Sequence, residues 1–146
     1  MRDDADIIFI FGGTNDYSIG IAPFGTGEDK EDKTFVGGLR VLIEGLIKKY
    51  PDKQIVFMTP IRRDDRVGAN NVNKTLSQYV SAIIKMCNKY GVPVLDAYNA
   101  PEMNLLTDKS NLIPDGLHPS AAGHEVMADW IYRQLQEKNI IQVVTP

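Results

Sequence analysis

Three short, mainly apolar runs divide the chain, and longer stretches with helical periodicity lie between and after them. The runs are Ile7–Phe11, Gln54–Thr59 and Val92–Leu95, and each is followed by glycine, proline or a polar residue. Runs of this length that are rich in β-branched and aromatic residues are typical of buried strands in parallel sheets covered by helices. The pattern therefore predicts three parallel strands, with Ile7–Phe11 buried on both faces.

Apolar residues at helical spacing predict three helices. The first covers Thr34–Tyr50, with Thr34 as its N-cap, and the second covers Asn71–Tyr90. The third begins after Ser120, which can cap it, and runs to about Lys138. Strands that alternate with helices in this way form parallel α/β layers. The predicted fold is therefore a three-layer α/β/α sandwich with a short parallel sheet.

The remaining segments are expected to be mostly loops. Tyr17–Lys33 is rich in glycine and charge and lacks either periodicity, and a loop of that length is usually functional or mobile. Ile61–Asn70 is a charged loop that leaves the carboxyl end of the second strand, and Ala97–Leu112 is irregular. Ile140–Val144 is predicted to be a short extra strand or a docked tail.

Length and composition narrow the class of protein. A chain of 146 residues predicts one domain over residues 1–146. The formal net charge of -3 disfavours a nucleic-acid partner held by a broad basic surface, and no apolar run approaches the roughly 20 residues of a membrane span. Three aspartates among the first six residues are unlike a secretory signal. The single cysteine, Cys87, is assigned to the apolar face of a helix and thus to the protein core. The acidic N-terminus and the lack of a second cysteine for a disulfide together favour a cytoplasmic protein.

The first candidate site directly follows the first strand. Gly12 and Gly13 allow a sharp turn or a close approach to a ligand, and Thr14 and Asn15 come next. Open parallel sheets bind ligands at the carboxyl ends of their strands, so this position favours a ligand site, with Tyr17 placed to line a pocket. The alternative is a polar strand-to-helix turn without a functional role, for which these residue types are equally suited.

The second candidate site is the segment Asp115-Gly-Leu-His118-Pro. An Asp-x-x-His spacing in a tight turn lets the carboxylate reach an imidazole nitrogen. Such a partner fixes the tautomer of the imidazole and stabilises the imidazolium, which leaves the other nitrogen free to act as a general base. The alternative is an aspartate that forms the turn and a histidine that lies on the surface before a helix.

No metal or cofactor is predicted. His118 and His124 could be combined with Asp115 into a metal site, but no further cluster of cysteine or histidine supports one. Gly12-Gly13 lacks the remainder of a dinucleotide fingerprint, which disfavours a nicotinamide site.

Arg62 and Arg63 follow the second strand at its carboxyl end. Both are candidates for holding an anionic substrate there, Arg62 first. The alternative is a solvated charge cluster that includes the adjacent Asp64 and Asp65.

Taken together, the two candidate sites resemble a known family. Gly13-Thr14-Asn15-Asp16, followed by Asp115-Gly-Leu-His118-Pro-Ser-Ala-Ala-Gly123, is similar to the third and fifth sequence blocks of the SGNH hydrolases, also called GDSL lipases or esterases. The resemblance implies a flavodoxin-like fold and hydrolysis of a small ester or thioester by a Ser-His-Asp triad without a metal. It also implies that Asn15 donates its amide to the oxyanion, that His118 is the base and that Asp115 orients it, with Gly13 and Thr14 next to the substrate.

The chain departs from the family in its first two blocks. The strand that ends in Gly-Asp-Ser and carries the nucleophile has no counterpart, and both missing blocks should lie upstream of Ile7. We therefore expect the chain to be the carboxyl-terminal part of an SGNH domain, truncated at its N-terminus and inactive alone. Ile7–Phe11 is then expected to be an open sheet edge that pairs two copies of the chain. The alternative is a non-catalytic α/β ligand-binding module that lost the nucleophile.

Overall fold

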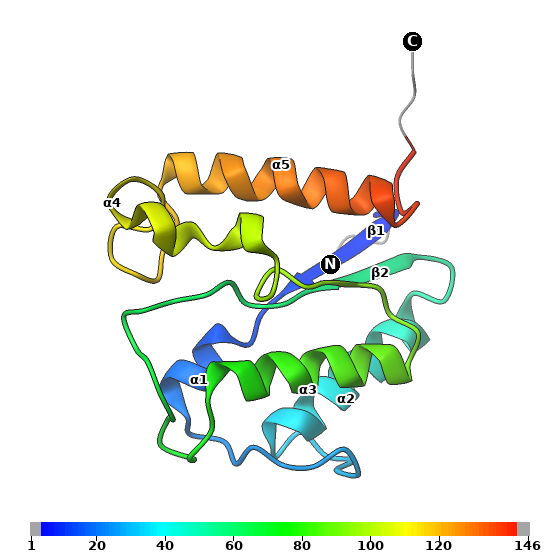
Figure 1. Ribbon diagram of the computed structural model, residues 1–146. Coiled ribbons are helices and arrows are strands. Elements are labelled where there is room, and N and C mark those ends of the chain that lie inside the picture. Colours follow the sequence, from blue (N-terminus) through cyan, green and yellow to red (C-terminus); the bar gives the residue numbers. More distant parts are fainter. Residues whose placement is uncertain (1–3, 143–146) are drawn as a thin grey trace. The chain divides into compact units, whose positions relative to one another are not determined.

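The computed structural model describes residues 4–142, and the chain within it divides into two compact units. Unit 1 contains the residues up to Pro60 together with Val67–Asp96. Unit 2 contains Ile61–Arg66 together with the residues from Ala97 onwards. Figure 1 labels helices α1 to α5 and strands β1 and β2.

Unit 1 contains a three-stranded parallel sheet, which confirms the predicted fold class. Strands β1 (Ile7–Phe11), β2 (Gln54–Met58) and β3 (Val94–Leu95) lie in the order β1-β2-β3. All neighbouring pairs are parallel. Strand β3 begins later than the predicted Val92, because Pro93 has no N–H group with which to extend the ladder.

Strand β1 is the edge of this sheet, and its side chains are unequally buried. Ile8 is 5% exposed, whereas Phe9 is 39% and Phe11 is 49% exposed. Successive side chains of a strand point to opposite faces of the sheet, so Ile8 and Ile10 share one face and Phe9 and Phe11 share the other. On the first of these faces Ile10 lines a cavity together with Leu39 of a neighbouring helix. The expectation that β1 is buried on both faces is therefore wrong for the face that carries Phe9 and Phe11.

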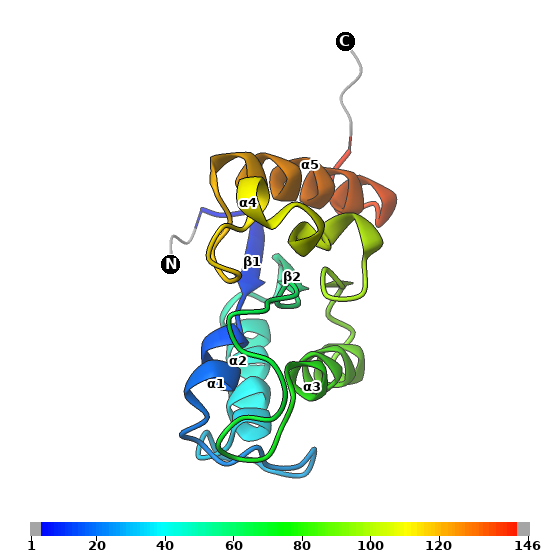
Figure 2. The same cartoon turned by 60° about the vertical axis from the view of Figure 1, so that its left-hand side comes forward.

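Two helices cover the same side of the sheet in unit 1 (Figures 1 and 2). They are α2 (Phe35–Lys49) and α3 (Leu76–Lys89), which pack against each other. The predicted cap of α2 is confirmed, since Thr34 Oγ1 accepts a hydrogen bond from the Gly37 N–H at 3.0 Å. A Cβ on Gly37 would lie 2.0 Å from the Glu31 carbonyl oxygen, so this glycine allows the preceding loop to pack closely against the helix.

Helix α3 begins five residues later than predicted. Asn70 accepts hydrogen bonds with its side-chain oxygen from the N–H groups of Val72 and Lys74. These bonds hold residues 70–74 in a turn, and an asparagine that bonds its own backbone in this way competes with helix formation. The helix then starts at Leu76, after the N-cap Thr75, which forms a capping box with Gln78.

The segment after β1 also contains a helix that the sequence did not predict. Helix α1 (Thr14–Ile19) lies where a turn followed by a long loop was expected. Both of its ends are glycines in the left-handed conformation, Gly13 with a φ of 104° and Gly20 with a φ of 57°. The loop proper therefore begins after Gly20.

Unit 2 is built from short helical turns and one long helix. The region predicted as irregular contains η1 (Pro101–Met103), η2 (Leu105–Asp108) and α4 (Lys109–Leu112). Helix α5 (Ala121–Glu137) starts after Ser120, as predicted, with the Ser120 hydroxyl accepting from the Gly123 N–H. Residues 140–142 form no strand, and the rest of the predicted strand or tail at Ile140–Val144 lies outside the described residues.

Two further observations bear on the class of protein. Cys87 is fully buried in α3, and its burial raises the pKa of its thiol to about 12, which confirms its assignment to the core. Within residues 4–142, no helix combines the length and the apolar character that crossing a bilayer requires.

Candidate functional site

Gly13 fixes the position of the polar residues that follow β1. Its φ of 104° is rarely adopted by other residues, and a Cβ there would lie 3.0 Å from Ile83 Cδ1. A side chain is therefore disfavoured both by the backbone conformation and by contact with α3. This turn places Thr14 and the exposed Asn15 in the first turn of α1, immediately after the carboxyl end of β1.

Asn15 lies beside a small cavity of unit 1. The cavity has a volume of about 280 Å³, and Asn15 and Asp16 are the polar members of a lining that is otherwise apolar or aromatic. That lining includes Ile19, Phe35 and Tyr79. A second cavity of about 270 Å³ is lined in part by Gly12 and Gly13. The polar turn after β1 therefore borders two cavities that could receive part of a small ligand.

Tyr17 does not line these cavities, which corrects the expectation that it contacts a substrate. Its side chain is 1% exposed, and its hydroxyl donates a hydrogen bond to the Gly68 carbonyl oxygen at 2.9 Å. Its ring packs edge-on against Tyr79, with 5.9 Å between ring centroids. The Asn70 amide donates both to the Tyr17 carbonyl oxygen and to the Tyr79 hydroxyl. Tyr17 is thus a buried structural residue.

The Asp115–His118 turn of unit 2 has the contact that its spacing predicts. Asp115 Oδ2 lies 2.7 Å from His118 Nδ1. Asp115 Oδ1 accepts hydrogen bonds from the N–H groups of Leu117 at 2.9 Å and His118 at 2.6 Å. The carboxylate is therefore held by the backbone on one oxygen and meets the imidazole with the other. The His118 side chain is 75% exposed, so the second ring nitrogen, Nε2, belongs to an accessible ring.

These bonds keep the Asp115 carboxylate ionised. The His118 N–H group, then the His118 side chain and then the Leu117 N–H group lower the pKa of Asp115 below its usual range. An ionised carboxylate at Nδ1 favours the tautomer in which Nδ1 carries the proton and Nε2 can accept one.

The lowered pKa of Asp115 predicts how this turn responds to acid. Because the folded pKa is depressed, the ionised carboxylate stabilises the turn above the ordinary aspartate pKa of about 3.9, and this contribution is lost as the pH falls through the lower folded value. We expect the side-chain carboxyl ¹³C resonance of Asp115 to show no protonation of the carboxylate down to pH 4. A pH titration by NMR measures this, and protonation of Asp115 at pH 4 or above would contradict it.

The loop that follows β2 holds the turn through Gly116. The Gly116 carbonyl oxygen accepts from the N–H groups of Asp64 at 3.0 Å and Asp65 at 3.4 Å. Gly116 has a φ of 76°, and a Cβ there would lie 1.9 Å from Asp64 Oδ1. Both the backbone conformation and the contact with Asp64 therefore require glycine within the Asp-Gly-Leu-His motif.

Arg63 shapes this loop, and the alternative of a solvated charge cluster is wrong for it. The Arg63 side chain is 2% exposed and forms a two-bond ion pair with Asp65, with Nε to Oδ1 at 2.6 Å and Nη2 to Oδ2 at 2.5 Å. This pairing lowers the pKa of Asp65. Arg62 lies with its guanidinium 4.5 Å from the centre of the Tyr98 ring. The role of Arg63 could not be found from the sequence, because adjacent opposite charges usually indicate solvated residues.

Replacing Gly116 with alanine tests this attachment. The forced left-handed backbone and the clash with Asp64 should lower the free energy of unfolding by about 1–3 kcal/mol. Urea denaturation measures the effect. Gly45→Ala is the control, because Gly45 lies within α2 with nothing near its missing Cβ, and should raise the free energy of unfolding by about 0.5–1 kcal/mol. Equal stabilities of the Gly116 variant and the natural chain would refute the assignment.

The candidate residues belong to two different units. Asn15 belongs to unit 1, whereas Asp115 and His118 belong to unit 2. In the part of the chain that the structure describes, no three residues among His, Cys, Asp and Glu gather where they could hold a metal ion. A carboxylate-paired imidazole and an asparagine amide are groups that serve acyl transfer.

Comparison with known proteins identifies the family. The GDSL-like lipase/acylhydrolase family matches residues 1–126, which include both sequence motifs. The chain belongs to this family. This GDSL-like chain has no match among curated proteins.

Solved structures similar to this GDSL-like chain have the same fold. A protein from Lactobacillus plantarum is 32% identical with a TM-score of 0.84, and the match covers 94% of this chain and 69% of that one. A possible lipase from Chitinophaga pinensis is 21% identical with a TM-score of 0.73, covering 93% and 74% of the two chains. A catalytic mutant of an acetylxylan esterase from Geobacillus stearothermophilus is 20% identical with a TM-score of 0.59, covering 89% and 59%.

Proposed function

We propose that this GDSL-like chain carries the general base and an oxyanion donor of a serine-type ester hydrolase. The observation that carries the proposal is the contact between Asp115 Oδ2 and His118 Nδ1 at 2.7 Å. In this role Asp115 holds the proton on Nδ1, so that His118 Nε2 is the basic nitrogen. Membership of a lipase and acylhydrolase family supports an ester as the substrate class.

The proposed reaction proceeds in two steps. His118 Nε2 takes the proton from a serine hydroxyl as the serine oxygen attacks the ester carbonyl, and the imidazolium then protonates the departing alcohol. A water molecule gives a proton to the same nitrogen as it attacks the acyl-serine, and His118 returns that proton to the serine as the carboxylic acid leaves. A thioester follows the same course with a thiol as the leaving group.

Asn15 is proposed to bind the oxygen that becomes negative in each step. Ligands of open parallel sheets bind at the carboxyl ends of the strands, and Asn15 follows β1 at that end. Its side-chain amide can donate a hydrogen bond to the oxyanion. Gly13 and Thr14 are proposed to contact the substrate beside it, and Arg62 is proposed to contact an acidic group where the substrate has one.

The proposal requires a nucleophile outside residues 1–146. Ser18 lies within helix α1 and Ser110 within α4. Ser77 and Ser81 are exposed positions of helix α3, and the Ser120 hydroxyl caps α5. None of these follows a strand in the sharp strand-to-helix turn that exposes a nucleophile. The serine is therefore assigned to sequence beyond this chain.

Expression of the longest open reading frame that contains residues 1–146 tests this function. The product should hydrolyse p-nitrophenyl acetate, and a fluorophosphonate should label one serine outside residues 1–146 in a one-to-one ratio. The chain of residues 1–146 alone should be neither active nor labelled. Absence of labelling in both proteins would overturn the proposal and favour a ligand-binding module.

We further propose that β1 pairs with a second copy of the chain. Within the described sheet β1 has β2 as its neighbour on one side, and Phe9 and Phe11 are among the exposed large apolar side chains. An apolar edge strand is a template for pairing with another chain, and a two-fold axis closes such a contact.

Sedimentation of the chain tests this pairing. The natural chain should be a dimer at micromolar concentration, and Phe9→Lys should give monomer or insoluble protein because a lysine would be buried at the contact. Val67→Lys is a matched control, since Val67 is 77% exposed in a loop of the same unit, and should leave the dimer intact. A folded natural monomer whose β1 amides exchange freely would contradict the pairing.

A further inference from the structure

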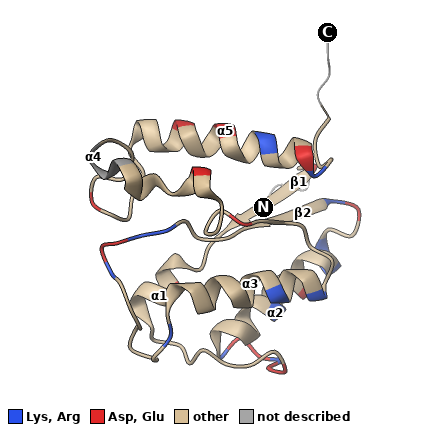
Figure 3. Cartoon of the chain, in the orientation of Figure 1, with Lys and Arg blue, Asp and Glu red and all other residues tan. Residues whose placement is uncertain are grey.

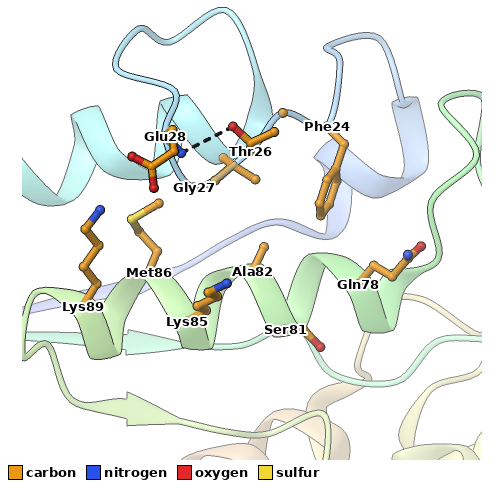
Figure 4. Close-up of a pocket in the computed structure, with 12 residues that line it drawn as sticks. Phe24, Thr26, Gly27, Glu28, Gln78, Ser81, Ala82, Lys85, Met86 and Lys89 are labelled. Atoms are coloured by element: carbon orange, nitrogen blue, oxygen red, sulfur yellow. Dashed lines mark hydrogen bonds between the residues drawn. The ribbon is translucent and has the colours of Figure 1, made fainter.

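Unit 1 contains a cavity larger than the two near the turn after β1. Its volume is about 550 Å³, and it lies between the loop Phe24–Glu28 and helix α3 (Figure 4). This volume falls within the range of about 300–1,000 Å³ that is usual for sites that bind small molecules. None of the residues assigned above to catalysis or substrate contact lines it.

The interior of this cavity is apolar. Phe24 from the loop, Val36 from α2, and Ala82 and Met86 from α3 contribute to its lining. Val36 and Met86 are buried, with 5% and 3% of their surface exposed. An aliphatic chain would therefore be removed from water on entering, which is favourable in proportion to the apolar area covered.

The loop that forms the other wall is held in place by specific bonds. The guanidinium of the buried Arg40 donates to the carbonyl oxygens of Gly27 at 2.7 Å and Glu28 at 3.4 Å. The Asp29 carboxylate accepts from the Thr26 N–H at 3.0 Å and from the Thr34 hydroxyl at 2.7 Å. The wall is thus formed before any ligand binds, so binding does not have to order it.

Two lysines give the mouth of the cavity a positive charge. Lys85 and Lys89 are the only charged residues of α3 (Figure 3), and they lie one turn apart on the same face of the helix. Both line the cavity, and Figure 4 shows Lys89 directed from α3 towards the loop. Glu28 is the one acidic residue of the lining, so the cavity carries a net charge of +1 by formal count of these three residues.

We propose that this cavity binds a straight-chain aliphatic carboxylate, with the chain over Met86 and Ala82 and the carboxylate between Lys85 and Lys89. The apolar interior selects the chain, and the two lysines of the lining favour a negative headgroup. Lysine offers a point charge and no planar fork, so the headgroup is selected here by its negative charge. This site goes beyond the proposed function and does not depend on it.

An NMR titration of the ¹⁵N-labelled chain with decanoate, kept below its micelle concentration, tests the site. Saturable shifts should be confined to residues 24–28, Val36 and residues 78–89. Decyltrimethylammonium has the same chain and the opposite charge, and should bind at least about tenfold more weakly. No saturable shifts in these residues, or equal binding of the cationic amphiphile, would overturn the proposal.

Two variants separate the charge from the cavity. Lys85→Gln with Lys89→Gln should weaken decanoate binding by about threefold to tenfold, as loss of two exposed ion pairs does. Lys48→Gln with Lys49→Gln, on exposed positions of α2, is the matched control and should leave the affinity unchanged. Ala82→Leu should fill the interior and weaken binding more than tenfold. Unchanged affinity in the Lys85 and Lys89 variant would refute the carboxylate assignment.

Discussion

Replacing His118 with alanine should lower ester turnover by about 10⁴- to 10⁶-fold in the protein that carries the nucleophile. Without the imidazole, no group takes the proton from the serine hydroxyl or returns one to the leaving group. The residual rate should come from the oxyanion donors and from substrate binding. Initial-rate measurements with p-nitrophenyl acetate over a range of concentrations give kcat and KM, and the loss should be in kcat.

His124 provides the control for this experiment. It is the only other histidine of the chain, and it is exposed on α5. Replacing it with alanine should leave kcat within about twofold, as surface substitutions usually do. Full activity in the His118 variant would refute the mechanism, and an equal loss in both variants would point to damage of α5 or of the turn before it.

Replacing Asn15 with alanine should lower kcat by about 10²- to 10³-fold, which corresponds to about 2.7–4 kcal/mol of lost transition-state stabilisation. The amide meets a negative charge only as the tetrahedral intermediate forms, so KM should change little. This loss should be smaller than that of the His118 variant, because other donors to the oxyanion remain.

Asn88 supplies the comparison for Asn15. It is an exposed asparagine of α3, and its replacement by alanine should leave kcat unchanged. A loss in the Asn15 variant that appears in KM and not in kcat would indicate ground-state binding and would contradict the role of Asn15 as an oxyanion donor.

The sequence predicted those elements whose signals are local. Apolar patterning within a few positions predicted strands β1 and β2. Capping residues predicted the start of α2 after Thr34 and the start of α5 after Ser120. The contact of Asp115 with His118 was also predictable, because only two residues of a tight turn, Gly116 and Leu117, separate them.

Features that depend on distant contacts could not be predicted. The burial of Tyr17 requires Gly68 and Tyr79, and the buried pair of Arg63 with Asp65 was indistinguishable in sequence from solvated charges. Helix α3 starts late because the Asn70 side chain bonds the backbone of Val72 and Lys74. From sequence alone, an asparagine at this position could equally have belonged to the first turn of the helix or to a turn before it. The support that residues 64–65 give to Gly116 joins segments about fifty positions apart.

The most direct test of the central claim is a crystal structure of the protein from the longest open reading frame after reaction with a fluorophosphonate. The account predicts that the phosphonyl oxygen lies about 2.7–3.1 Å from Asn15 Nδ2, with His118 Nε2 within hydrogen-bond reach of the labelled serine Oγ. Asp115 should still contact His118 Nδ1. An adduct with Asn15 and His118 at opposite ends of the sheet, or a protein in which no serine reacts, would contradict the account.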